Sequence, residues 1–157
     1  MRAETKKLLK SIAIPVVSGA VVGFITSGSM RQFAALEQPP LSPPGWLFPV
    51  VWTILYTAMG ISSYLIYNAD AEEQKKRQAL FLYGAQLIVN LLWSIFFFLL
   101  DWYLFSFFWL VMLWILVFKM IKEFADISKI AAYLNIPYLL WLTFAAYLNL
   151  GIWWLNR

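Results

Sequence analysis

The chain has 157 residues, enough for one domain, but its composition is that of a membrane protein rather than a soluble one. Apolar residues make up 62% of the chain and charged residues only 13%, while the mean hydropathy is +0.72 and the net charge +4. The sequence contains no cysteine and no histidine, which excludes disulfides, thiolate nucleophiles, Cys/His zinc sites and Ser-His-Asp triads.

Five stretches are long and apolar enough to cross a bilayer, whose core of about 30 Å needs about 20 helical residues. They occupy residues 8–28, 46–68, 79–100, 102–122 and 130–154. The first is too long for a cleavable signal peptide, so we expect it to be retained as a span. The predicted fold class is an all-α membrane protein, with residues 1–157 forming a single bundle of five transmembrane helices.

The loop between the first two spans, residues 29–45, is rich in proline. Pro39, Pro40, Pro43 and Pro44 fix the backbone φ angle and prevent a continuous helix through this segment. We therefore expect a stiff loop that acts as a lid over an opening between the helices.

Basic residues are distributed unequally between the two predicted sides of the membrane. Ten lie on the side of the N-terminus: Arg2, Lys6, Lys7, Lys10, Lys75, Lys76, Arg77, Lys119, Lys122 and Lys129. Only Arg31 and Arg157 lie on the other side. The positive-inside rule therefore predicts a cytoplasmic N-terminus and a C-terminus outside.

All eight acidic residues fall in loops, tails or helix ends, which disfavours ion-coupled transport and acid–base catalysis. The polar residues within the spans are neutral and share helical faces with aromatic residues. These faces carry Gln86, Asn90, Trp93 and Phe97 on the third span, Trp52, Tyr56, Met59 or Gly60, and Ser63 on the second, and Tyr138, Trp141, Ala145 and Leu148 or Asn149 on the fifth. Such faces suit a pocket for a large, flat, mostly apolar ligand, although they would also serve to pack the bundle.

Small residues recur every fourth position on the first span, at Gly19, Gly23 and Ser27. A stripe of this kind allows close approach of a neighbouring helix, within the bundle or between subunits.

Several segments, taken in order, resemble the TspO/translocator protein family, also called tryptophan-rich sensory proteins or peripheral benzodiazepine receptor-like proteins. Phe33–Pro39, Pro43–Trp46 and Phe48–Tyr56 are similar to the first loop and second helix of that family. Gln86–Ser94 and Pro137–Ala145 are similar to its third and fifth helices.

The resemblance implies a five-helix bundle, commonly a homodimer, that acts as a membrane receptor or binding protein with a regulatory or sensory role. The implied ligands are flat and hydrophobic, such as the porphyrins protoporphyrin IX and haem, and no cofactor is required. By matched position, the implied ligand-binding residues are Gly23, Pro43, Pro44, Phe48, Val51, Trp52, Tyr56, Asn90, Trp93, Trp141, Ala145 and Leu148.

Two other functions remain open: light- and oxygen-dependent porphyrin degradation, and transport of a small molecule such as a tetrapyrrole. The chain has Gln32-Phe33 where the family usually has Trp-Tyr, and Gln38 where it usually has Lys. The missing tryptophan weakens the case for photochemical degradation, so binding without catalysis is the preferred interpretation. Because the chain begins without an amphipathic, acid-poor presequence, the expected location is the bacterial plasma membrane.

Overall fold

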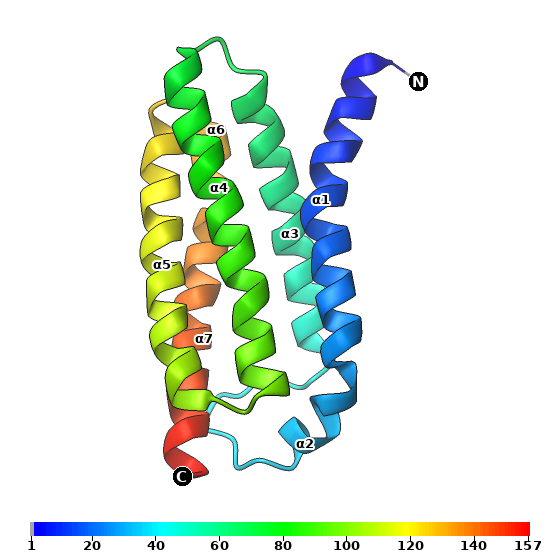
Figure 1. Cartoon of the computed structure of the whole chain (residues 1–157), viewed down its shortest axis with the longest axis vertical. Helices are drawn as coiled ribbons and strands as arrows, with labels where there is room; N and C mark the ends of the chain where they lie inside the picture. The colour runs from blue at the N-terminus through cyan, green and yellow to red at the C-terminus, as the bar shows by residue number, and fades with distance from the viewer. Residues whose placement is uncertain (1) are drawn as a thin grey trace.

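The computed structural model describes residues 2–157, which form helices and connecting loops without a strand (Figure 1). The helices are α1 (Ala3–Thr26), α2 (Met30–Ala34), α3 (Leu47–Tyr67), α4 (Glu73–Ser94), α5 (Tyr103–Ala125), α6 (Lys129–Tyr133) and α7 (Ile136–Leu155). Over this part of the chain, five helical segments are long and apolar enough to cross a membrane. The predicted fold class is therefore confirmed.

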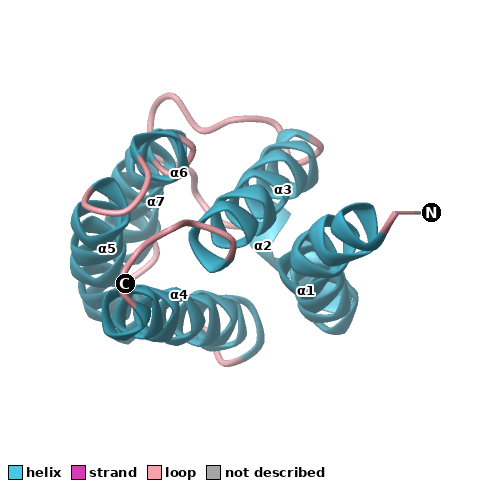
Figure 2. Cartoon of the chain, turned by 90° about the horizontal axis from the view of Figure 1, so that it is seen from above, coloured by secondary structure: helices cyan, strands magenta, loops and turns pink. Residues whose placement is uncertain are grey.

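The long helices are arranged in a ring. Seen from above, α1 is followed by α3, then by α6 and α7, then by α5 and finally by α4 (Figure 2). α1 packs mainly against α3, while α5 packs against both α4 and α7. The two chain termini lie at opposite ends (Figure 1).

The segments that carry the ten basic residues gather at the end of the bundle where α1 begins. The α3–α4 connection and the α5–α6 turn lie at this same end (Figure 1). Residues 27–46, the α4–α5 turn and the C-terminus occupy the other end, which we call the strap end. The asymmetry of charge read from the sequence is thus an asymmetry between the two ends of the molecule.

The fifth predicted span, residues 130–154, is divided into α6 and α7. Pro137 lies in the first turn of α7, where a missing N–H costs nothing, whereas a helix continuing from α6 would need that donor. The Asn135 side chain occupies the break and donates to Ser62 Oγ at 2.9 Å and to the Ala131 carbonyl at 3.0 Å. These bonds fix the break against α3.

The third predicted span also differs at its ends. α4 begins at Glu73 rather than residue 79 and continues into a π-helical stretch, Ile95–Leu99. The turn to α5 is short, as expected, and is closed by Asp101 with a φ of 54°. Aspartate is one of the few residues besides glycine that adopts this left-handed conformation at low cost.

α1 and α3 approach each other closely at Gly60. A Cβ atom built there would lie 2.7 Å from the Ser11 carbonyl oxygen and would collide with the Ile12 backbone. Pro15 has no N–H to offer the Ser11 carbonyl four residues earlier, so this oxygen lacks its usual helical donor. Glycine at position 60 thus allows the backbones of α1 and α3 to touch, and any side chain at this position would push the two helices apart.

We expect Gly60→Ala to lower the free energy of unfolding by about 1–3 kcal/mol, since the new methyl group meets backbone atoms that cannot rotate away. The matched control is Gly84→Ala on α4, where an added Cβ meets nothing within 4 Å. Alanine favours a helix interior over glycine, so this control should be neutral or stabilising by up to about 1 kcal/mol. Equal unfolding midpoints for the two variants in detergent would contradict the close packing of α1 on α3.

Candidate functional site

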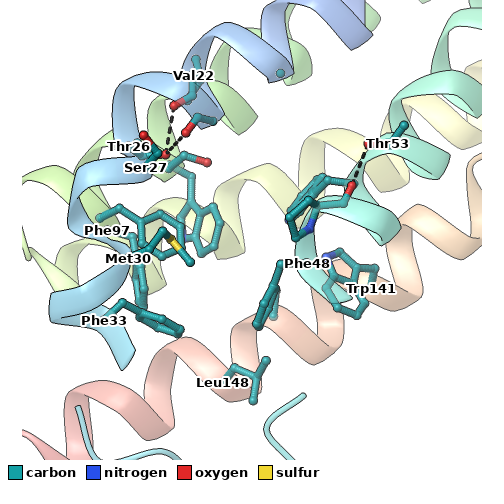
Figure 3. Close-up of a pocket in the computed structure, with 18 of the residues that line it drawn as sticks. Val22, Thr26, Ser27, Met30, Phe33, Phe48, Thr53, Phe97, Trp141 and Leu148 are labelled. Atoms are coloured by element: carbon teal, nitrogen blue, oxygen red, sulfur yellow. Dashed lines mark hydrogen bonds between the residues drawn. The ribbon is translucent and has the colours of Figure 1, made fainter. Parts of the chain in front are cut away.

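A cavity of about 530 Å³ lies inside the strap end of the bundle, between α1, α3, α4 and α7. This volume is within the range of about 300–1,000 Å³ that is usual for small-molecule sites. Phe48 and Trp141 lie on one side of it, and Met30, Phe33 and Phe97 on the other (Figure 3). Its aromatic lining consists of Phe33, Phe48, Trp52, Tyr56, Trp93, Phe97, Phe98 and Trp141.

The aromatic rings that line the cavity pack against one another. Trp52 stacks on Tyr56 with 5.4 Å between ring centroids, and Trp141 meets Trp52 edge-on at 6.5 Å and 89°. On the α4 side, Trp93 stacks on Phe97 at 5.3 Å. Aromatic pairs with these geometries contribute beyond the area they bury, so the walls are preformed without a ligand.

The indole N–H groups of two cavity tryptophans differ in their hydrogen bonding. Trp93 Nε1 donates to Asn149 Oδ1 at 3.0 Å, and the Asn149 amide donates in turn to the Tyr103 carbonyl at 2.8 Å. Trp141 Nε1 is buried and finds no acceptor among residues 2–157. A buried donor without a partner costs about 1–3 kcal/mol, and an acceptor atom on a ligand would recover this cost once a small shift of the ring exposed the N–H to the cavity.

A chain of buried hydrogen bonds joins α3, α4 and α7 beneath the cavity. Tyr56 Oη donates to Asn90 Oδ1 at 2.9 Å, and Asn90 Nδ2 donates to Tyr138 Oη at 2.6 Å. Tyr138 Oη donates to Gln86 Oε1 at 2.7 Å. The four side chains are almost fully enclosed, so they orient Tyr56, the one of them that lines the cavity.

The segment 30–45, which we call the strap, crosses the end of the bundle and supplies Met30, Phe33 and Gln38 to the cavity lining. Its helical part is joined to the α4–α5 turn, where Gln32 Nε2 donates to Asp101 Oδ2 at 3.1 Å.

The remainder of the strap is attached to α7. The Asn156 amide bonds both the N–H and the carbonyl of Glu37, at 3.0 and 2.9 Å. Tyr147 Oη donates to the Pro40 carbonyl at 2.7 Å, and Pro39 packs against Gly151. The strap is thus tied down at both halves, and its action as a lid stays a prediction.

Eight of the twelve residues predicted to bind ligand line this cavity: Gly23, Phe48, Trp52, Tyr56, Trp93, Trp141, Ala145 and Leu148. The other four do not. Pro43 and Pro44 lie in the turn that leads into α3, where the Pro44 carbonyl accepts from Leu47 N–H. Val51 packs against the hydrophobic core instead, and both ends of the Asn90 amide are used by Tyr56 and Tyr138.

α1 contributes more of the lining than the sequence prediction assigned to it. Gly19, Gly23 and Ser27, the small-residue stripe, all lie along the cavity. A Cβ added at Gly19 would strike the ring of Tyr56, whereas one added at Gly23 meets nothing within 4 Å. Within the chain, the stripe permits a close approach to α3 at Gly19 and leaves space beside the cavity at Gly23, while contact between subunits stays a prediction. The small residues at every fourth position of α1 are therefore the feature of the sequence that could have predicted this wall of the cavity.

Comparison with known proteins agrees with this architecture. Residues 11–155 match the TspO/MBR family. The chain belongs to the TspO/MBR family. Among its TspO relatives, the tryptophan-rich protein TspO of Chlorobaculum tepidum is 38% identical over 79% of this chain and 78% of its own length. The TspO of Archaeoglobus fulgidus is 36% identical over 96% of this chain and 97% of its own.

The similarity extends to animal members of the TspO/MBR family. The translocator protein of Ovis aries is 35% identical over 85% of this chain and 80% of its own length. Together with the five apolar helices, membership supports a multi-pass membrane protein of the sensory or binding kind.

Proposed function

We propose that the chain is a membrane receptor for a flat, largely apolar ligand of the porphyrin type, such as protoporphyrin IX or haem, bound in the cavity at the strap end. The observation that carries this proposal is the lining itself: aromatic walls on opposite sides and one buried indole N–H without an acceptor. Flat rings with oxygen atoms at their edge complement such a site in both shape and polarity.

The electrostatics of the lining narrow the ligand class further. None of the described residues that line the cavity is charged. A charged group buried there would lose its hydration without gaining a partner, so the ligand's carboxylates must remain near water. We expect the propionates of a porphyrin to lie toward the strap, where Gln38 supplies polar lining in place of the lysine usual in the family.

Tryptophan fluorescence tests this proposal because Trp52, Trp93 and Trp141 all line the cavity. Protein in lipid nanodiscs, titrated with protoporphyrin IX in darkness, should show saturable quenching with one ligand per chain. Linear quenching without a plateau, equal to that of empty nanodiscs with a soluble tryptophan, would remove the proposal. Repeating the titration under light and following porphyrin absorbance separates binding from degradation.

The same proposal includes a location and an orientation. The ten basic residues at one end favour a cytoplasmic N-terminus in a bacterial plasma membrane, with the strap and the cavity at the outer side.

We further propose a homodimer, in line with the resemblance noted from the sequence. The apolar residues exposed on α1, including Ile14, Val17 and Phe24, supply surface for lipid or for a second chain.

A further inference from the structure

The wall of the cavity is incomplete on one side, between α1 and α3. Ala20, Gly23 and Ser27 on α1 line the cavity and yet are exposed at the molecular surface. Pro49 and Thr53 on α3 are exposed and line the cavity as well. Two helices therefore present facing edges, made mostly of small side chains, at which the cavity reaches the outside.

The spacing between the two helices changes along their length. At Gly60 an added Cβ would strike the backbone of α1, and at Gly19 it would strike the ring of Tyr56 on α3. At Gly23, one turn further along the same face of α1, an added Cβ meets nothing within 4 Å. The helices are thus in contact in one half of the bundle and apart in the strap half.

The surface around this opening is apolar. Val21 and Phe24 of α1 are 52% and 81% exposed, and Val50 and Ile54 of α3 are 47% and 62% exposed. Thr53 lies about 9 Å along α3 from its start, at 1.5 Å per residue. Its hydroxyl donates to the Pro49 carbonyl at 2.7 Å, so it presents no unsatisfied polar group. A surface of this kind lies against the hydrocarbon of a bilayer.

The route from water is, by contrast, obstructed. The strap is bonded to the α4–α5 turn through Gln32 and Asp101, and to α7 through Glu37 and Asn156. Opening it would break these bonds together with that of Tyr147 to the Pro40 carbonyl. The lateral opening needs no bond between α1 and α3 to be broken at Gly23.

We propose that ligand enters and leaves the cavity sideways, from the hydrocarbon of the leaflet at the strap side, through the opening between α1 and α3. This inference rests on the proposed function, because it describes the route to the same cavity. By this route, the rate of binding depends on the concentration of the ligand in the membrane rather than on its concentration in water.

The first test locks the strap. A Cβ built on Gly151 lies 2.7 Å from Pro39 Cβ, so the pair Pro39→Cys and Gly151→Cys needs to separate by only about 1 Å to form a disulfide. The chain has no cysteine of its own, so one variant can be compared oxidised and reduced. The association rate of protoporphyrin IX, supplied from donor vesicles and followed by quenching, should agree within about twofold between the two states. A fall of about fivefold or more on oxidation overturns the lateral route.

The second test narrows the opening. Gly23→Leu places a side chain at the open edge, where an added Cβ meets nothing within 4 Å. Gly84→Leu on α4 makes the same change at a glycine that is equally free at Cβ and does not line the cavity. Gly23 also lines the cavity, so a leucine that only crowded the bound ligand would speed dissociation. Narrowing the route instead predicts that Gly23→Leu slows association and dissociation alike, each by about fivefold or more. Unchanged rates, or an effect on dissociation alone, would overturn the route.

Different results would contradict the proposed function and the lateral route. If the unmodified protein shows no saturable quenching by protoporphyrin IX, the proposed function is wrong. If it binds saturably but responds to the oxidised strap and not to Gly23→Leu, only the lateral route is wrong.

Discussion

Replacing Trp141 by Phe is expected to weaken protoporphyrin IX binding by about 5- to 100-fold, because a buried N–H that lacks an acceptor in the free protein gains about 1–3 kcal/mol when the ligand supplies one. The aromatic ring remains, so most of the stacking surface is kept and only the indole donor is lost. In the ligand-free protein this donor is buried without an acceptor, so its removal strands no partner. We therefore expect the variant to unfold close to the temperature of the unmodified protein.

Trp114→Phe is the matched control, since Trp114 Nε1 donates to Thr143 Oγ1 at 2.9 Å and its side chain does not line the cavity. Its quenching titration should coincide with that of the unmodified protein. If the two substitutions weaken binding equally, the indole of Trp141 has no direct role in recognition.

Replacing Tyr138 by Phe is expected to have the largest effect on stability of any single-atom deletion in the bundle. It removes the hydroxyl that accepts from Asn90 Nδ2 and donates to Gln86 Oε1, and it leaves both amides enclosed. Hydrogen bonds within membrane proteins contribute roughly 0.6–1.7 kcal/mol each, so the loss of two should cost about 1–3 kcal/mol.

Tyr133→Phe removes the same atom from a ring that is 62% exposed, and should change stability by less than about 0.5 kcal/mol. The two variants can be compared by denaturant unfolding in mixed micelles. The Tyr138 variant should also bind ligand less tightly, because Tyr56 loses the support of a correctly placed Asn90. A stability difference near zero would show that the buried chain of hydrogen bonds is not formed in the membrane.

The bundle was predictable from the sequence because crossing a bilayer requires long apolar runs, and five such runs are visible. The faces carrying Trp52, Trp93 and Trp141 followed from helical periodicity, and all three residues line one cavity. Periodicity also placed Asn90 on an interior face, which is correct, since it is 1% exposed.

Helical periodicity does not specify which residue on a neighbouring helix lies opposite. The tyrosines at positions 56 and 138 bond both ends of the Asn90 amide, so this side chain lies outside the cavity lining and supports Tyr56, which belongs to it. That α1 lines the cavity depends on its distance from α3. This distance is seen in the different surroundings of Gly19 and Gly23 in the structure and not in the sequence. Pairing and separation of helices arise from their tilt and rotation, which a single sequence does not encode in a local pattern.

The structure of the protein with protoporphyrin IX bound, determined in nanodiscs, tests the central claim most directly. The account predicts one porphyrin per chain inside the cavity, with its ring against Trp52 and an acceptor atom within hydrogen-bond distance of Trp141 Nε1. A porphyrin found only on the outer surface of the helices, with the cavity unchanged, would contradict it.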